Sequence, residues 1–176
     1  MNSIAVIITD DDKVFTKQEE IVNSLEPDLP VIQGKNPGID PEYEKRKHAL
    51  WTKLLFEKSY ERVILISPEL TLKGSFLKDI PKDGDVYALN YGIYQIPPNT
   101  PMATVWGIHP LKYAHLRFAV ITSKRFSDLW FRLCMSEHLN YYPRYELDLF
   151  NILLQYGDFD VRYPNKPQLW QEISIP

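Results

Sequence analysis

WTKLLFEKSYERVILISPELTLKG, residues 51–74, is the stretch that decides the fold. Its first half spaces apolar side chains along one face of a helix. A short polar connection leads into Val63–Ile66, an unbroken apolar run closed by Pro68, which is typical of a strand buried on both faces. Helix, connection and strand form an α/β unit, and ligands of open α/β sheets lie just beyond the carboxyl ends of the strands. The sequence therefore predicts a site at residues 67–69.

The composition is that of an ordinary globular protein. With 176 residues, of which 44% are hydrophobic, the chain can bury one core, so we expect a single domain over residues 1–176. A formal net charge of −3 provides no overall positive field, which argues against nucleic acid as a partner. No run approaches the roughly 20 apolar residues of a membrane span, and no secretory signal is visible. We therefore expect a cytoplasmic protein.

Further strands and helices alternate along the chain. Short apolar runs predict strands, and the amphipathic stretches between them predict helices. Strands that alternate with helices form parallel sheets, so the expected fold class is α/β, a mostly parallel Rossmann-like sheet flanked by helices. The predicted strands lie at residues 4–8, 29–32, 63–66, 85–89, 118–122 and 159–163.

Polar and acidic residues follow the first predicted strand. Thr9, Asp10 and Asp11 lead directly into a helical pattern. Acidic side chains at such a position cap the helix and favour the positive end of its dipole. The alternative is that they line a ligand pocket at the strand end. The residues alone leave both interpretations open.

A predicted helix at residues 145–154 is apolar nearly all round, which indicates that it is buried. It nevertheless contains Glu146, Asp148 and Asn151. Buried carboxylates are costly unless they are paired or face a ligand. Glu146 and Asp148 are therefore candidate functional groups.

Two of these segments resemble the GT-A nucleotide-sugar glycosyltransferases, in particular glycogenin and the bacterial lipopolysaccharide galactosyltransferases. Residues 51–74 share Trp-Thr-Lys-Leu, a helix, Tyr-x-Arg-Val-Ile-Leu-Ile, three residues that include an acid, and Leu-x-Leu-x-Gly. Residues 146–151 align with the family motif Asp-Gln-x-Leu-Leu-Asn. After the central strand the family carries Asp-x-Asp, where this chain has Ser67-Pro68-Glu69.

The resemblance implies a glycosyltransferase that moves a sugar from a nucleotide-sugar donor, UDP-linked, to a hydroxyl of a carbohydrate or other acceptor. It implies that Glu69 supplies an oxygen ligand to Mn²⁺ or Mg²⁺ beside the donor diphosphate. It places the catalytic groups Glu146 and Asp148 near the reactive carbon of the sugar.

The resemblance also implies a set of donor-binding residues. The loop after the first strand is expected to hold the nucleoside, and lysines elsewhere are expected to reach the phosphates. A metal-free alternative has the lysines and an arginine neutralise the leaving diphosphate. For Lys53 the plain alternative is a solvated side chain on the outer face of its helix. The expected donor-binding residues are Thr9, Asp10, Asp11, Lys53, Arg117 and Lys166.

The altered Asp-x-Asp position keeps two other functions open. One is a binding or scaffold protein that retains the fold without turnover. The other is sugar transfer onto modified DNA, against which the acidic net charge argues. The sequence contains no serine–histidine–acid set, Walker loop or Gly-x-Gly-x-x-Gly motif, so hydrolase and phosphate-loop functions have no support.

Overall fold

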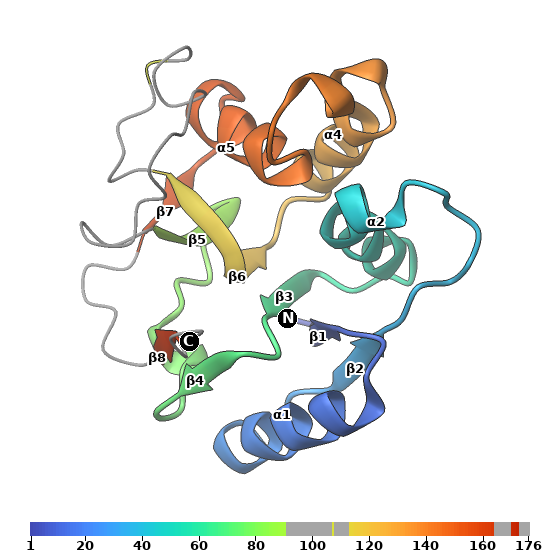
Figure 1. Cartoon of the computed structure of the whole chain (residues 1–176). Helices are drawn as coiled ribbons and strands as arrows, with labels where there is room; N and C mark the ends of the chain where they lie inside the picture. The colour runs from blue at the N-terminus through green and yellow to red at the C-terminus, as the bar shows by residue number, and fades with distance from the viewer. Residues whose placement is uncertain (91–106, 108–112, 164–169, 173–176) are drawn as a thin grey trace.

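A six-stranded sheet organises the molecule (Figure 1). The computed structural model describes residues 1–90, 107, 113–163 and 170–172. In spatial order the strands are β2 (Val31–Gly34), β1 (Ser3–Ile8), β3 (Arg62–Ile66), β6 (Ala114–Ile121), β5 (Val86–Asn90) and β7 (Val161–Arg162).

Five of the six strands run in one direction. β1 is parallel to β2 and β3, and β5 is parallel to β7, whereas β6 is antiparallel to its neighbours β3 and β5. This arrangement confirms the expected α/β fold with a mostly parallel sheet. Because β6 is reversed and Phe118 pairs with Ile66, the first residues of β6 lie at the edge where β3 ends.

Helices cover both faces of the sheet. α2 (Tyr43–Glu57), α4 (Lys124–Cys134) and α5 (Glu146–Tyr156) lie on one face, and α1 (Asp12–Leu25) lies on the other (Figure 1). The 3₁₀ turns η1 (Leu77–Asp79) and η3 (Glu137–Tyr141) are short, and β4 (Leu70–Leu72) pairs with β8 (Trp170–Glu172) in a separate two-stranded sheet.

The strands divide their side chains between two cores, as the two-residue period of a strand requires. On β1, Ile4, Val6 and Ile8 pack toward α2, α4 and α5, whereas Ala5 and Ile7 pack toward the α1 side. Every residue of β3 is buried. Burial on both faces explains why the strand is an unbroken apolar run rather than an alternating one.

Several strand boundaries differ from the sequence prediction, and the strand expected at residues 159–163 covers only Val161–Arg162. The strand expected at residues 29–32 begins at Val31, because Pro30 has no N–H and joins the sheet only through its carbonyl, which accepts from the Ala5 N–H at 2.9 Å. The strand expected at residues 118–122 begins at Ala114. Its first residues include His115 and Arg117, so they lack the apolar pattern that predicts a strand. The small β4–β8 sheet was not predicted.

In the described part of the chain, no helix is long and apolar enough to cross a membrane. The longest, α2, has 15 residues, against the roughly 20 apolar residues that a bilayer requires.

Candidate functional site

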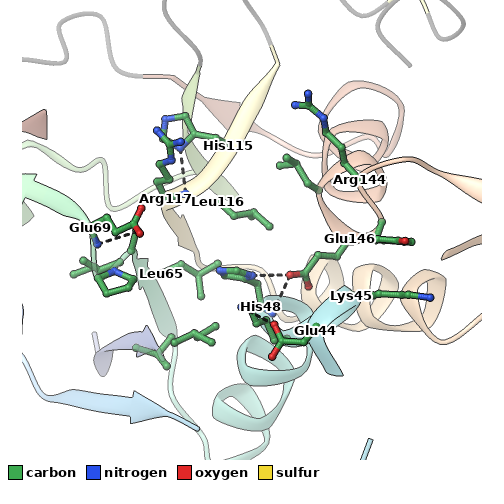
Figure 2. Close-up of a pocket in the computed structure, with 18 residues that line it drawn as sticks. Glu44, Lys45, His48, Leu65, Glu69, His115, Leu116, Arg117, Arg144 and Glu146 are labelled. Carbon is green, nitrogen blue, oxygen red and sulfur yellow. Dashed lines mark hydrogen bonds and ion pairs between the residues drawn. The ribbon is translucent and has the colours of Figure 1, made fainter. Parts of the chain in front are cut away.

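A pocket of about 400 Å³ opens at the carboxyl end of β3 (Figure 2). Its floor includes Val6 and Ile8 from β1. Its walls are the first turns of α2, residues 65–69, the start of β6 and the start of α5. The segment 67–69, at which the sequence predicts a site, thus forms one wall of this pocket.

The α2 wall is shaped by a kink at Arg46, whose backbone is non-helical with φ −145° and ψ 23°. The Arg46 guanidinium donates to both oxygens of Asp40, at 2.6 Å from Nε and 2.5 Å from Nη2. It also donates from Nη1 to the Cys134 carbonyl at 3.1 Å. The guanidinium holds the pKa of Asp40 below its ordinary value. This buried pair fixes the direction in which α2 continues past the kink.

The Glu146 carboxylate binds the segment of α2 that follows the kink. Oε1 accepts from the His48 N–H at 3.2 Å and lies 2.6 Å from Nδ1 of the His48 ring. Oε2 accepts from the Ala49 N–H at 3.1 Å. Glu146 is buried, and its own carbonyl accepts from Trp130 Nε1 at 3.0 Å. A carboxylate at the N-terminal end of a helix segment is favoured by the exposed N–H groups there.

Tyr145, directly before Glu146, has an unusual backbone with φ 48° and ψ −119°. A non-glycine residue in such a region costs on the order of 1–3 kcal/mol and is kept only where its surroundings fix it. Here Lys45 Nζ lies 5.0 Å from the centre of the tyrosine ring. The Tyr145 N–H donates to the Tyr142 carbonyl at 3.1 Å. The strained turn positions Glu146 at the pocket wall.

The pocket carries a small excess of positive side chains. Two of them are already paired, Lys45 with Glu42 at 2.8 Å and Lys47 with Glu44 at 3.1 Å. Among the residues that the structure describes, none is hydrogen-bonded or ion-paired to the guanidinium of the half-buried Arg144. The charged residues that line the pocket are Lys45, Lys47, Arg117 and Arg144 against Glu44, Glu69 and Glu146.

The acidic loop after β1 lies outside the lining of this pocket. Asp11 is the N-cap of α1 and accepts from the Lys13 and Val14 N–H groups at 2.9 and 3.1 Å. Asp10 accepts from the Asn36 N–H at 2.8 Å, and the Thr9 hydroxyl oxygen accepts from the Asp11 N–H at 3.1 Å. The loop shares the sheet edge with residues 67–69, because β1 and β3 are parallel neighbours.

The structure brings three of the predicted residues together in the pocket: Glu69, Arg117 and Glu146. Lys53 lies away from it, paired with Glu57 at 2.9 Å and 5.4 Å from the centre of the Phe131 ring.

Asp148 is also outside the lining. It is buried and accepts from the Tyr113 hydroxyl at 2.5 Å and from the Arg144 N–H at 2.9 Å. Lys166 lies outside the described residues.

Among the described residues, Glu69 does not belong to a group of three metal-ligating side chains. Glu69 is exposed at the pocket rim, and its N–H donates to the Ser67 hydroxyl at 3.2 Å. Within the described ranges, no three His, Cys, Asp or Glu side chains are close enough together to hold a metal ion. A hard divalent cation prefers several oxygen ligands, and the described residues around Glu69 do not supply that set.

Sequence reasoning missed His48 and Arg144. His48 contacts Glu146 across 98 positions of sequence, so no local pattern reveals the pair. The available signal is indirect: a carboxylate at the start of an apolar helix needs a partner, and a neighbouring helix must provide it. Arg144 stands in a turn beside that carboxylate.

Comparisons with known proteins bear on the fold. No protein-family model and no curated protein matches the sequence. Among solved structures, the chain is similar to a glycosyltransferase involved in the glycosylation of the major capsid of PBCV-1. The TM-score is 0.61 at 11% identity, over 93% of this chain and 80% of the other.

Two further solved structures share this fold. The catalytic domain of Drosophila β1,4-galactosyltransferase 7 gives a TM-score of 0.56 at 9% identity, over 99% of this chain and 72% of that one. A nucleoside-diphosphate-sugar pyrophosphorylase from Vibrio cholerae RC9 gives 0.55 at 11% identity, over 98% and 76%. The chain therefore shares the fold of these structures, a Rossmann-like α/β sheet flanked by helices.

Proposed function

We propose that this protein transfers a sugar from a nucleotide-sugar donor to an acceptor hydroxyl, and that the donor binds in the pocket at the end of β3. The observation that carries the proposal is the pocket itself, about 400 Å³ in volume and lined by two arginines and a partly buried histidine–glutamate contact. A pocket at the carboxyl end of a central strand is where open α/β sheets bind ligands. The solved structures with this fold include glycosyltransferases and a nucleotide-sugar pyrophosphorylase.

The leaving group in such a reaction is a nucleoside diphosphate, whose negative charge must be stabilised. Arg144, in the turn before α5, and Arg117, on β6, line the pocket. A planar guanidinium binds phosphate oxygens in pairs, which suits a diphosphate. We propose that these arginines neutralise the diphosphate, since the described carboxylates and histidines do not form a metal-binding set. Glu69 then stands at the rim as an acceptor for sugar or ribose hydroxyls.

A calorimetric titration with UDP-glucose, UDP-galactose and the corresponding GDP-sugars tests the donor site. We expect at least one UDP-sugar to bind with equal affinity in EDTA and in Mn²⁺. Arg144→Gln should weaken that binding about tenfold or more, because it removes a charge-assisted hydrogen bond to phosphate. Arg132→Gln, at an exposed position of α4, is the matched control and should bind like the wild type.

Two results would count against this account. Absence of binding by every sugar nucleotide, with and without metal, would contradict the donor site. Binding that requires Mn²⁺ would contradict neutralisation by arginines alone and would return Glu69 to a metal-binding role.

A second candidate is a protein that binds the donor without turnover. It is favoured by one observation: Asp148, a candidate catalytic carboxylate, is held in the core by Tyr113 rather than facing the pocket. Donor binding without release of free sugar or free nucleoside diphosphate, measured over hours at several pH values, would support this function over transfer.

A further inference from the structure

The contact between His48 and Glu146 defines the state of the imidazole ring. Glu146 Oε1 lies 2.6 Å from His48 Nδ1. A carboxylate oxygen accepts hydrogen bonds, so this contact places the ring proton on Nδ1. In the neutral ring, Nε2 then carries the lone pair and can accept a proton.

The ring lies in the pocket wall rather than in the core. Figure 2 shows the imidazole between the Glu146 carboxylate and Leu65, with its far edge turned toward the β3 side of the pocket. The His48 side chain is 23% exposed, whereas that of Glu146 is 7% exposed. His48 thus lines the pocket with part of its side chain open to it, so a ligand bound there can approach the ring.

We propose that His48 is the general base of the transfer reaction and that Glu146 is its positioning residue. This inference rests on the function proposed above. The acceptor oxygen attacks the anomeric carbon of the donor sugar and gives its proton to His48 Nε2. The bond from that carbon to the diphosphate oxygen breaks, and its electron pair leaves with the nucleoside diphosphate.

Glu146 itself is poorly placed to take the proton or to attack the sugar. Oε1 already contacts the His48 N–H and ring nitrogen, and Oε2 accepts from the Ala49 N–H. The carboxylate therefore orients the imidazole and stabilises its protonated form, as in other carboxylate–histidine pairs. With His48 as the base and Glu146 held by its contacts to α2, we expect a single displacement, which inverts the anomeric configuration.

Several charged and titratable groups line the same pocket as His48. They come from its own helix, from α5, from the segment after β3 and from β6. These groups are Glu44, Lys45, Lys47, Arg144, Glu146, Glu69, His115 and Arg117.

The first test replaces the base and follows release of UDP from the UDP-sugar that the wild type turns over, with water or an added sugar as acceptor. His48→Gln should lower kcat about 100-fold or more, the usual contribution of a general base, while the donor Kd measured by calorimetry is unchanged. His138→Gln, an exposed histidine on η3, is the matched control and should retain the wild-type kcat.

The second test uses the pH profile and chemical rescue. Wild-type kcat should fall in acid, because a proton on Nε2 removes the lone pair, and this limb should be absent in His48→Gln. Added imidazole should restore part of the activity of His48→Ala. Glu146→Gln should lower kcat about tenfold or more with the donor Kd retained, because the imidazolium loses its anionic partner.

The outcomes separate this inference from the proposed function. Three results would each overturn the assignment of His48 as the base. The first is a kcat of His48→Gln equal to that of the wild type, and the second is survival of the acid limb in that variant. The third is a sugar product with retained configuration, observed by NMR. The proposed glycosyl transfer would then still hold, but His48 would not be its base. A wild type that binds the donor but never turns it over would overturn both.

Discussion

Asn151 shows how one buried side chain joins the site helix to the sheet. Its Oδ1 accepts from the Ala114 N–H at 2.7 Å, and its Nδ2 donates to the Ala114 carbonyl at 2.8 Å and to the Leu147 carbonyl at 2.9 Å. The amide thus ties the first residue of β6 to α5. Both elements contribute walls to the pocket, so this residue maintains the site without facing it.

Asn151→Ala should therefore lower the free energy of unfolding by about 2 kcal/mol, because it removes partners from buried backbone groups. Urea denaturation followed by tryptophan fluorescence measures the change. Asn23→Ala, at an exposed position in α1, is the matched control. Equal stability of the two variants would show that the Ala114 backbone groups find other partners.

At the scale of a single element, the kink in α2 determines how this helix meets Glu146. The side chains of Arg46 and Asp40 are 10% and 9% exposed, so the ion pair that fixes the kink is largely removed from water. Because α2 changes direction there, the His48 and Ala49 N–H groups meet Glu146. The pair thereby determines the geometry of the proposed base.

At neutral pH, Asp40→Asn should lower the free energy of unfolding by about 3 kcal/mol, since it leaves the buried Arg46 without its counter-charge. Arg46 holds the pKa of Asp40 below its ordinary value, so the stabilisation is present above the unfolded-state value of about 4. It is lost as the pH falls through the lower folded-state value, where the folded carboxylate also takes up a proton.

Urea titrations of wild type and variant from pH 7 down to pH 2 test both the size and the sign of this effect. The difference between them should shrink in acid. Asp12→Asn, which breaks an exposed pair with Lys35, is the control and should have a much smaller effect at every pH. A difference between wild type and Asp40→Asn that is constant with pH would contradict the account of the kink.

At the scale of the whole molecule, the sequence predicts the fold well because the strands are buried. Val63–Ile66 is apolar throughout, and both faces of β3 are covered. The start of β6 was missed because its sequence has no apolar pattern. This part of the strand is held by hydrogen bonds to Asn151 and by pairing with β5.

The candidate site was predicted only in part. The rule that ligands lie beyond the carboxyl ends of strands led to residues 67–69, which line the pocket. The partners of Glu146 could not be predicted, because they depend on where α2 kinks and packs. The same holds for Lys53, whose pairing with Glu57 and distance from the pocket follow from the rotation of its helix.

The central claim is that the pocket between α2, β3, β6 and α5 binds a sugar nucleotide. A crystal structure soaked with a non-hydrolysable UDP-sugar tests it most directly. We predict the diphosphate within hydrogen-bond distance of the Arg144 guanidinium and the anomeric carbon facing His48 Nε2. A nucleotide bound elsewhere on the sheet edge, or a sugar turned away from His48, would contradict the account.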